Sequence, residues 1–322
     1  MTGALAIATR GSALARWQAD HVVALLAASG GGVDAELVIV ETTADKRLDI
    51  PIWEMGGKGV FVKEVQAALL DGRADIAVHS AKDLPSGTVD RLVLAAVPER
   101  ADPRDVLVGA TLGGLGPGAP IATGSVRRRV QLADLRPDLT FTGLRGNIAT
   151  RLDKIPAGGA IVMAAAALDR LALHDRLAEQ GIACEVLAPS VLLPQVAQGA
   201  LAIECREDDA EARSLLAAIE HGPSRRTFDA ERAFLAELGG DCDLPAGAHA
   251  VPAGGAADVG AVDVGEGEGD GGGVLRLDAL LASPDGHVVL RTSVEGADPD
   301  RLGREAARTL LDDSGGRALL HP

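Results

Sequence analysis

Short apolar runs alternate with segments of helical periodicity along most of this sequence, and no other feature constrains the fold as strongly. Residues 5–9 are typical of a buried strand, and Ser12 is placed to cap a helix that turns an apolar face inward. Residues 37–41 predict the next strand, residues 61–69 a second helix and residues 75–79 a third strand. Such alternation indicates an α/β protein built on parallel sheets.

Two proline-containing stretches interrupt the alternation. Residues 97–105 hold two prolines and five charged side chains, and residues 189–194 begin and end with proline. We interpret both as crossings between domains. Residues 200–204 again predict a buried strand, which could return to the first sheet after the second crossing. A double crossing of this kind predicts two lobes with a cleft and a hinge between them.

A third unit begins with a helix near Ser224. Strands are predicted over residues 274–281 and 287–294, and a last helix over residues 299–311. Residues 253–273 consist of Gly, Ala, Asp and Glu with isolated valines. Such a composition cannot bury a core, so we expect a flexible hairpin insertion without chemistry.

Arginines gather in one stretch of an otherwise acidic chain. Residues 121–151 contain six arginines and two acidic residues, whereas the whole chain has a net charge of −15. Two strand-to-helix turns in this stretch, residues 124–128 and 144–147, offer free N–H groups to an anion, and guanidinium groups bind carboxylates in a bidentate geometry. We predict a site for carboxylates or phosphates on one lip of a cleft, although any single arginine could merely solvate a helix face. The residues that carry this prediction are Thr123, Ser125, Arg127, Arg128, Arg145, Asn147 and Arg151.

The charge distribution argues against nucleic acid as a partner. From residue 241 to the end there are fifteen Asp and Glu against six Arg, whereas a phosphate backbone requires a broad basic face. No apolar run approaches the roughly eighteen residues that a membrane span requires. Arg10, Arg16 and Asp20 interrupt the N-terminus where an export signal would be apolar. We therefore predict no nucleic-acid or membrane partner.

The three cysteines, Cys184, Cys205 and Cys242, are too widely spaced for a metal site, and we predict none. Their number and spacing favour a reducing cytoplasm over a disulfide framework, so a cytoplasmic location is expected. We interpret Cys184 and Cys205, like His79, as packed residues without a chemical role.

Two short motifs in the first part of the chain carry candidate chemistry. Residues 55–64 place Lys58 on a glycine-rich turn before a helix, but they lack the spacing of a phosphate-binding loop. Residues 79–85 end a strand with Asp83 beside Lys82 and before a proline. Asp83 is a candidate functional carboxylate, with a role as the partner of Lys82 or as a turn residue as the alternative.

A third motif, residues 239–245, places Cys242 on a loop of the third unit. Asp241 and Asp243 flank this thiol and are expected to raise its pKa, which disfavours a nucleophile that must act in every turnover. A thiol that reacts once with a strong electrophile and then stays alkylated is compatible with this setting. An inert, packed cysteine is the alternative.

Taken together, these motifs resemble the porphobilinogen deaminase (hydroxymethylbilane synthase) family over almost the whole chain. Each motif is modest alone, and their order and spacing carry the resemblance. The matching pieces are Ile7-Ala8-Thr9-Arg10-Gly11-Ser12, Gly56-Gly57-Lys58-Gly59, Ala77-Val78-His79-Ser80-Ala81-Lys82-Asp83-Leu84-Pro85, Asp102-Pro103-Arg104-Asp105, Leu144-Arg145-Gly146-Asn147, Gln198-Gly199-Ala200, and the loop around Cys242 with Pro245 and Gly247.

The resemblance implies a fold of two type II periplasmic-binding-protein-like lobes joined by a hinge, with a smaller C-terminal α/β domain. On this basis residues 1–98 and 195–218 form domain 1, which carries the catalytic aspartate. Residues 102–190 form the arginine-rich, anion-binding domain 2. Residues 219–322 form domain 3, which attaches the cofactor. A monomer is expected.

The resemblance also implies a transferase of tetrapyrrole (haem) biosynthesis with a dipyrromethane cofactor, two linked pyrrole rings joined by a thioether to Cys242. Four porphobilinogen molecules are added in turn with loss of ammonia, and the linear tetrapyrrole hydroxymethylbilane is released by hydrolysis. Asp83 matches the catalytic carboxylate of the family. The residues implied to bind the cofactor are Cys242, Lys58, Lys82, Asp83, Thr123, Ser125, Arg127, Arg128, Arg145 and Gly146, and those implied to bind the substrate are Arg10, Ser12, Arg151, Arg170 and Gln198.

The residues alone are also compatible with two other classes of protein. A solute-binding protein would share the two-lobed cleft, but it should carry an export signal and has no need of Cys242. A cysteine-dependent hydrolase would need a histidine near the thiol, and His249 is the only candidate nearby in the sequence.

Overall fold

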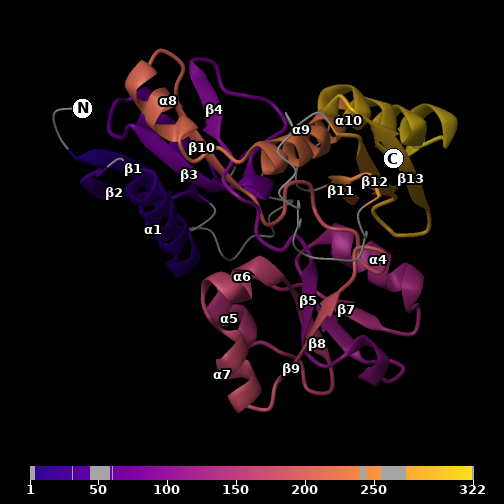
Figure 1. Ribbon diagram of the computed structural model, residues 1–322. Helices are drawn as coiled ribbons and strands as arrows, with labels where there is room; N and C mark the ends of the chain where they lie inside the picture. The colour runs from indigo at the N-terminus through magenta and orange to yellow at the C-terminus, as the bar shows by residue number, and fades with distance from the viewer. Residues whose placement is uncertain are drawn as a thin grey trace. The chain divides into compact units, whose positions relative to one another are not determined.

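The structure is a computed structural model that describes residues 4–30, 32–43, 59, 61–239, 244–254 and 273–320 (Figure 1). The chain divides into two compact units, Met1–Arg100 with Ala200–Arg225 and Ala101–Gly199 with Arg226–Pro322. The chain therefore leaves the first unit within the stretch interpreted as the first crossing. It returns at Ala200, the first residue of the strand predicted after the second crossing.

A five-stranded mixed sheet forms the centre of the first unit, with the strand order β2-β1-β3-β10-β4 (Figure 1). Its strands are β1 (Leu5–Arg10), β2 (Ala35–Val40), β3 (Ile76–Ser80), β4 (Leu92–Ala96) and β10 (Leu201–Arg206). β1 pairs in parallel with β2 and β3, while β10 lies antiparallel between β3 and β4. The predicted return of residues 200–204 to the first sheet is thus confirmed.

Helices cover both faces of this sheet. They are α1 (Ala13–Ala28), α3 (Lys63–Leu70) and α8 (Ala210–Ala217). α1 and α8 bury Val22 and Leu216 in one apolar cluster, and α3 buries Val65 and Leu69 in another. Adjacent residues of β1 and β3 alternate between the two clusters, so these strands are buried on both sides.

The first-unit strands and helices expected from the sequence are present, with ends shifted by at most two residues. Ser12 caps α1 as predicted, since its hydroxyl accepts a hydrogen bond from the Ala15 N–H at 3.2 Å. β4 is not predicted by the sequence pattern, because its five residues lie between turns and have no helical segment of clear periodicity beside them.

The second unit contains a five-stranded sheet of the same design, with the order β7-β6-β8-β5-β9. Its strands are β5 (Asp105–Gly109), β6 (Pro120–Ala122), β7 (Thr140–Thr142), β8 (Ala160–Ala164) and β9 (Ala183–Leu187). β6 pairs in parallel with β7 and β8, and β5 runs antiparallel to β8 and β9. In both units the strand that follows a crossing takes the fourth, antiparallel position, which is the arrangement of type II periplasmic-binding-protein-like lobes.

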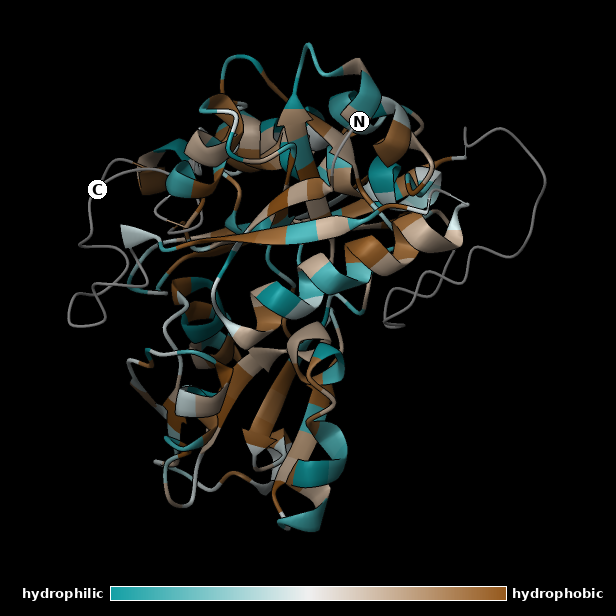
Figure 2. Cartoon of the chain, turned by 90° about the vertical axis from the view of Figure 1, so that its left-hand side faces the viewer, coloured by the Kyte–Doolittle hydropathy of each residue, from teal (hydrophilic) through white to brown (hydrophobic). Residues whose placement is uncertain are grey.

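Helices flank this second sheet as well. They are α4 (Val126–Leu135), α5 (Ile148–Leu152), α6 (Ala165–Arg170) and α7 (His174–Glu179). Leu107 and Leu132 belong to the apolar cluster on one face, and Ile161 and Leu168 to the cluster on the other. Figure 2 shows the apolar strands of this sheet between helices whose outer surfaces are hydrophilic.

A three-stranded antiparallel sheet completes the second unit, with the order β11-β12-β13. Its elements are β11 (Ala246–Pro252), β12 (Leu275–Ala282) and β13 (Val289–Gly296), with the helices α9 (Gly222–Glu237), α10 (Pro299–Arg308) and α11 (Arg317–Leu320). The predicted last helix ends earlier than residue 311, because residues Thr309–Asp313 continue as a π-helical turn. Of the predicted insertion, only Ala253, Gly254 and Gly273 lie within the described residues.

The expected fold class is confirmed: two five-stranded mixed sheets with flanking helices, and a smaller sheet near the C-terminus. The smaller sheet packs on α4, where Val130 meets Leu280 and Ala282. None of the helices in the described ranges is both long and apolar enough to span a bilayer.

Replacement of Gly199 by alanine is expected to destabilise the second unit. Gly199 has a φ of +87°, and a Cβ atom there would lie 2.3 Å from the carbonyl oxygen of Ala101. The left-handed conformation alone costs about 1–3 kcal/mol for a residue with a side chain, and the overlap adds to this. Chemical denaturation should show a larger loss for Gly199→Ala than for Gly158→Ala, because Gly158 has a φ of +69° with open space around it. Equal losses would contradict the steric argument.

Candidate active site

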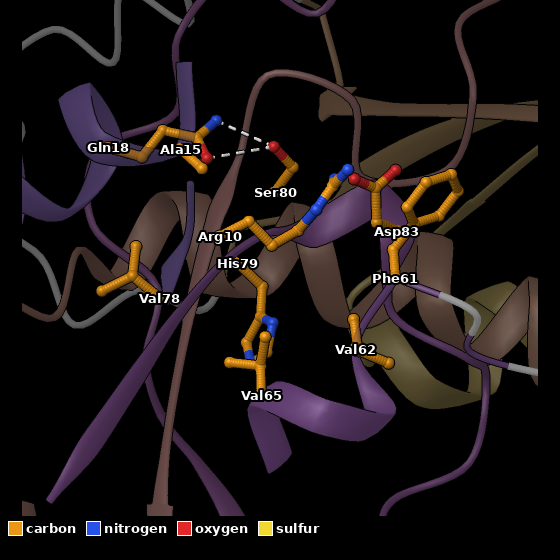
Figure 3. A pocket seen from close by; sticks show the side chains of 10 residues that line it. All are labelled: Arg10, Ala15, Gln18, Phe61, Val62, Val65, Val78, His79, Ser80 and Asp83. Carbon is orange, nitrogen blue, oxygen red and sulfur yellow. Dashed lines mark hydrogen bonds between the residues drawn. The ribbon is translucent and has the colours of Figure 1, made fainter. Parts of the chain in front are cut away.

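A depression in the first unit lies at the ends of two neighbouring strands (Figure 3). β1 ends at Arg10 and β3 ends at Ser80, and the two strands pair in parallel. Parallel strands bring their carboxyl ends to one edge of the sheet, where open α/β folds usually bind ligands. The depression is lined by Arg10, Ala15, Gln18, Phe61, Val62, Val65, Val78, His79, Ser80 and Asp83.

Asp83 lies on a single helical turn directly after β3. This turn, η2 (Ala81–Asp83), is fixed at its start, where the Ala81 N–H donates to the Ala200 carbonyl oxygen at 3.1 Å. At its end the Leu84 N–H donates to the Ala81 carbonyl oxygen at 3.2 Å. The Asp83 side chain is partly exposed and lines the depression. The predicted catalytic carboxylate is therefore held by backbone hydrogen bonds and still open to a ligand.

Arg10 contributes a cation to the same depression. Its Cζ atom lies 4.7 Å from the centroid of the Phe61 ring, which is a cation–π contact. Figure 3 shows the Arg10 guanidinium and the Asp83 carboxylate on the same side of the depression, next to Phe61. A cation and a carboxylate so placed suit a ligand that carries both an acidic group and an amine.

Gln18 and Ser80 form a polar pair that the sequence pattern does not identify. The Gln18 Nε2 atom donates to the Ser80 Oγ atom at 2.8 Å, and this hydroxyl can donate back to Oε1 at 3.2 Å (Figure 3). Gln18 is buried on α1, four residues before the buried Val22. A polar residue within the apolar stripe of a helix is the only sequence signal that could have revealed it.

The other predicted site residues of the first unit have simpler settings. Ser12 uses its hydroxyl as the cap of α1. Lys82 lies in η2 and is partly buried. Lys58 lies outside the described residues.

In the second unit, a buried carboxylate holds two of the predicted arginines. Asp105 is fully buried, and its two oxygens lie 2.7 Å from Nη2 of Arg127 and 2.7 Å from Nη2 of Arg128. Both arginines lie in the first turn of α4, which Ser125 caps by accepting a hydrogen bond from the Arg128 N–H. Gln198 also donates to Asp105, at 2.9 Å. The structure thus brings Ser125, Arg127, Arg128 and Gln198 together around a residue that the sequence analysis gives no role.

Backbone carbonyl groups fix these guanidinium groups further. Nη1 of Arg127 donates to the Leu193 carbonyl oxygen at 2.5 Å, and Nη1 of Arg128 donates to that of Val162 at 2.9 Å. Arg127 and Arg128 are only 3% and 7% exposed. Their orientation is therefore set by the protein before any ligand binds.

The electrostatics of this cluster leave a positive surplus. Burial alone would raise the pKa of Asp105, but Arg127 and Arg128 overcome this effect and lower the pKa to about 2. Asp105 is therefore ionised at neutral pH. Burial lowers the pKa of Arg127, while Asp105 opposes that effect. One carboxylate faces two guanidinium groups, so the cluster keeps about one net positive charge to attract an anion.

The remaining predicted residues of the second unit lie on the strand-to-helix turns, on α5 or on α6. Thr123 is buried, and its hydroxyl accepts a hydrogen bond from the Ser125 N–H at 3.2 Å. Nε of Arg151 donates to the Gly146 carbonyl oxygen at 2.8 Å. Burial lowers the pKa of Arg145, and it lowers that of Arg170 to about 10.

The loop expected to carry the reactive thiol leads into β11. Cys242 itself lies outside the described residues. The Ala248 N–H of β11 donates to the Pro194 carbonyl oxygen at 3.1 Å. A Cβ atom on Gly247 would lie 2.8 Å from the Pro194 carbonyl oxygen, so glycine lets the start of β11 pack closely on this backbone, and Cδ of Arg127 lies beside the same position, at 3.4 Å. His249 is 1% exposed with its Nδ1 atom 3.8 Å from Oε1 of the buried Glu231, an enclosed setting that offers little to a hydrolase mechanism.

Two family models together match nearly the whole chain. One is described as "Porphobilinogen deaminase, dipyromethane cofactor binding domain" and matches residues 5–214. The other is described as "Porphobilinogen deaminase, C-terminal domain" and matches residues 226–312. The chain belongs to the porphobilinogen deaminase family. The resemblance seen in the sequence motifs is confirmed.

Full-length relatives lead to the same family. The porphobilinogen deaminase of Nitratidesulfovibrio vulgaris strain Miyazaki F is 42% identical, over 98% of this chain and 96% of the relative. That of Chromobacterium violaceum is 44% identical, again over 98% of this chain and 96% of the relative. Among solved structures, the Bordetella pertussis BvgS periplasmic VFT2 domain is 17% identical, over 67% of this chain and 86% of that chain, with a TM-score of 0.40.

In the sequence, Asp105 belongs to a family motif and to a crossing between domains, and neither indicates its role. Its role as the buried partner of Arg127 and Arg128 depends on contacts with residues more than twenty positions away. No local pattern marks such a residue. A charged residue at the start of an apolar strand was the only available hint.

Proposed function

We propose that the chain is a hydroxymethylbilane synthase, a transferase that joins porphobilinogen molecules stepwise, with loss of ammonia, into hydroxymethylbilane. The observation that carries this proposal is the family match, which spans 98% of the chain. The depression around Asp83 and the arginine cluster around Asp105 supply chemistry that suits this reaction.

Asp83 is the proposed catalytic residue. The amino group of porphobilinogen must leave as ammonia, which requires a proton, and its departure leaves a positive charge on the pyrrole unit. A carboxylic group in the depression can pass a proton to the leaving amine, and the resulting carboxylate then stabilises the cation. The hydrogen bonds that fix η2 keep this group in place during the change of charge.

The proposed carboxylate ligands are the basic residues of both units. Each porphobilinogen carries an acetate and a propionate, so a growing chain presents two acids per ring. Arg10 and Lys82 would serve in the first unit, together with Lys58 of the Gly56-Gly57-Lys58-Gly59 motif. In the first unit, Ser12 completes the substrate-binding set. The proposed set in the second unit is Thr123, Ser125, Arg127, Arg128, Arg145, Gly146, Arg151, Arg170 and Gln198.

The second unit fits a dipyrromethane cofactor by its donor set. The cluster of Arg127, Arg128 and Asp105 keeps a positive surplus, and Nε of Arg127 is buried without a hydrogen-bond partner among the described residues. Such donors match the carboxylate groups of the cofactor, which would be tethered to Cys242. The cofactor supplies, when bound, the pyrrole carbon at which chain growth begins. The protein groups named here bind and orient it.

We further propose the three-domain division, with residues 1–98 and 195–218 as the catalytic domain, 102–190 as the anion-binding domain and 219–322 as the cofactor-attachment domain. In each five-stranded sheet one strand, β10 or β5, follows a crossing between the units. This connectivity supports a hinge between the catalytic and the anion-binding domains. We propose a monomer in the cytoplasm, on the basis of the family.

Intact mass spectrometry of the purified protein tests the proposed function. We expect a mass excess of two pyrrole units, which Cys242→Ser should lose while Cys184→Ser retains it. Turnover of porphobilinogen should accompany the excess mass and disappear with it. A protein that carries no excess mass and releases no ammonia from porphobilinogen would overturn the proposal.

Replacement of Arg145 by leucine is expected to lower kcat/KM for porphobilinogen about ten- to a hundredfold. The change removes a partly desolvated guanidinium, and a hydrogen bond to a charged group is worth about 1.5–3 kcal/mol. Steady-state kinetics on cofactor-loaded protein measure the effect. Arg129→Leu is the matched control, because Arg129 is exposed and donates to the Pro284 carbonyl oxygen. Equal kinetics for the two variants would remove Arg145 from the site.

A further inference from the structure

A buried glutamate lies in the sheet that ends at the Asp83 depression. Glu204 on β10 is only 4% exposed. Nε2 of Gln66 donates to both of its carboxylate oxygens, at 3.1 and 3.0 Å. Nε2 of His79 lies 3.0 Å from Oε2, without the alignment of a hydrogen bond. Burial of a carboxylate is costly unless polar groups contact it, and here side chains from two different elements do so.

The two side chains that contact Glu204 come from two different elements that line the depression. His79 is on β3, immediately before Ser80, and it lines the depression itself. Gln66 is on α3, next to Val65, which also lines the depression. Figure 3 shows the imidazole of His79 turned toward Val65 and away from Asp83. Glu204 therefore meets the depression through His79, whose imidazole lies away from Asp83.

The backbone around Glu204 is adjusted at this point. The pairing of β10 with β4 shifts register between Ile203 and Glu204, whereas its pairing with β3 continues without a shift. Such irregularities re-aim side chains and are common next to active sites. The same strand begins beside Ala200, whose carbonyl oxygen holds the Asp83 turn. Strand β10 thus begins directly after the residue that holds the Asp83 turn, and it carries the carboxylate that contacts His79.

We propose that Glu204 is a positioning residue for the deamination chemistry. Through His79 it holds β3, and through Gln66 it holds α3, so it fixes the two walls of the depression on which Asp83, Ser80 and Phe61 are placed. This inference rests on the proposed function, because it assigns Glu204 a part in that same reaction. Its action is indirect, through the placement of groups that meet the substrate.

The test compares Glu204→Gln with Asp75→Asn in the full-length, cofactor-loaded protein. Asp75 also carries a hydrogen-bonded carboxylate, which accepts from the Ala6 N–H at 3.0 Å and lies 3.4 Å from Nη2 of Arg206. It precedes β3, at the end of the strand opposite the depression. The two variants therefore lose the same charge in the same sheet but at different distances from Asp83.

We expect Glu204→Gln to lower kcat about ten- to a hundredfold while KM changes by less than about threefold, since small misplacements of reacting groups cost rate more than binding. Asp75→Asn should lower the melting temperature and leave kcat unchanged. Rates are measured well below the melting temperature of both variants. Equal kcat values for Glu204→Gln and Asp75→Asn, with an active parent protein, would overturn the inference. A parent protein that does not consume porphobilinogen would overturn the proposed function instead.

A double-mutant cycle provides a second readout and covers a variant that fails to fold. Residues that act as one unit give non-additive effects. Glu204→Gln combined with His79→Gln should have a kcat within about threefold of the worse single variant, whereas independent roles would multiply the two losses. If Glu204→Gln does not fold, Gln66→Met breaks only the link to α3 and should still lower kcat with little change in KM. An unchanged kcat for Gln66→Met would then overturn the inference.

Discussion

Replacement of Asp83 by asparagine is expected to lower turnover of porphobilinogen by at least about a hundredfold. General acid–base assistance is typically worth about 10² to 10⁴ in rate, and the amide keeps the shape of the side chain while it removes both the transferable proton and the charge. The backbone hydrogen bonds that hold η2 do not involve the Asp83 side chain, so the turn should keep its conformation. The loss should therefore appear in kcat rather than in stability.

The Asp83 experiment measures ammonia release per cofactor-loaded molecule, with loading determined by intact mass. Asp90→Asn is the matched control, because Asp90 is an exposed aspartate seven residues further along the same unit. Normal turnover in Asp83→Asn, at full loading, would remove Asp83 from the mechanism. A loss of the same size in Asp90→Asn would show that the effect is not specific to the depression.

Replacement of Asp105 by asparagine is expected to destabilise the second unit by about 3–5 kcal/mol. Removal of one partner from a buried ion pair leaves the other charge uncompensated, and here two guanidinium groups lose their shared carboxylate. The asparagine side chain can still accept hydrogen bonds, but it cannot offset two buried positive charges. Arg127 and Arg128 should also lose their fixed orientation, so cofactor loading is expected to fall.

Denaturant titration of the parent and variant proteins measures the free energy of unfolding. Asp138→Asn is the control, because Asp138 forms a comparable pair with Arg136 at 2.7 Å but its side chain is 36% exposed. Exposed pairs are worth less than about 1 kcal/mol. If Asp105→Asn and Asp138→Asn lower the free energy of unfolding by equal amounts, the buried cluster does not stabilise the second unit more than an exposed ion pair does.

The Asp105 cluster also predicts how stability depends on pH. The pKa of Asp105 is lowered from 3.8 to about 2 in the folded protein, so the unfolded chain binds its proton first as the pH falls. The stability that Asp105 contributes is therefore present above about pH 4 and is lost between there and about pH 2. Between about pH 4 and pH 2, the free energy of unfolding should fall more steeply with decreasing pH for the parent protein than for Asp105→Asn. Parallel curves would contradict the predicted ionisation.

The sequence was sufficient for the elements and residues that have a local signal. Ser12 shows its capping role by residue type and position, and the return of β10 to the first sheet follows from an apolar run after a proline-rich crossing. Asp83 was located by its motif at the end of a strand. Each of these depends on neighbours in the chain, which a single sequence displays directly.

The remaining features depend on contacts that no local pattern encodes. Asp105 faces Arg127 and Gln198, and Glu204 faces His79 and Gln66, across separations of 22 to 138 residues. The sequence analysis gave His79 no role because a histidine in an apolar strand has no local partner. Burial and pairing of polar groups appear only when the sheets are assembled.

The strand order of the first sheet has a consequence for how the chain folds during synthesis. Among the described strands, β4 pairs only with β10, which begins more than a hundred residues later. The N-terminal segment therefore leaves the ribosome with two strands, β3 and β4, that lack this neighbour. The five strands from β5 to β9 are contiguous in sequence, so their sheet can assemble before any later part of the chain has been synthesised. We therefore expect the middle of the polypeptide to reach its native arrangement before the beginning does. The early segment depends on protection from aggregation until residues 201–206 emerge.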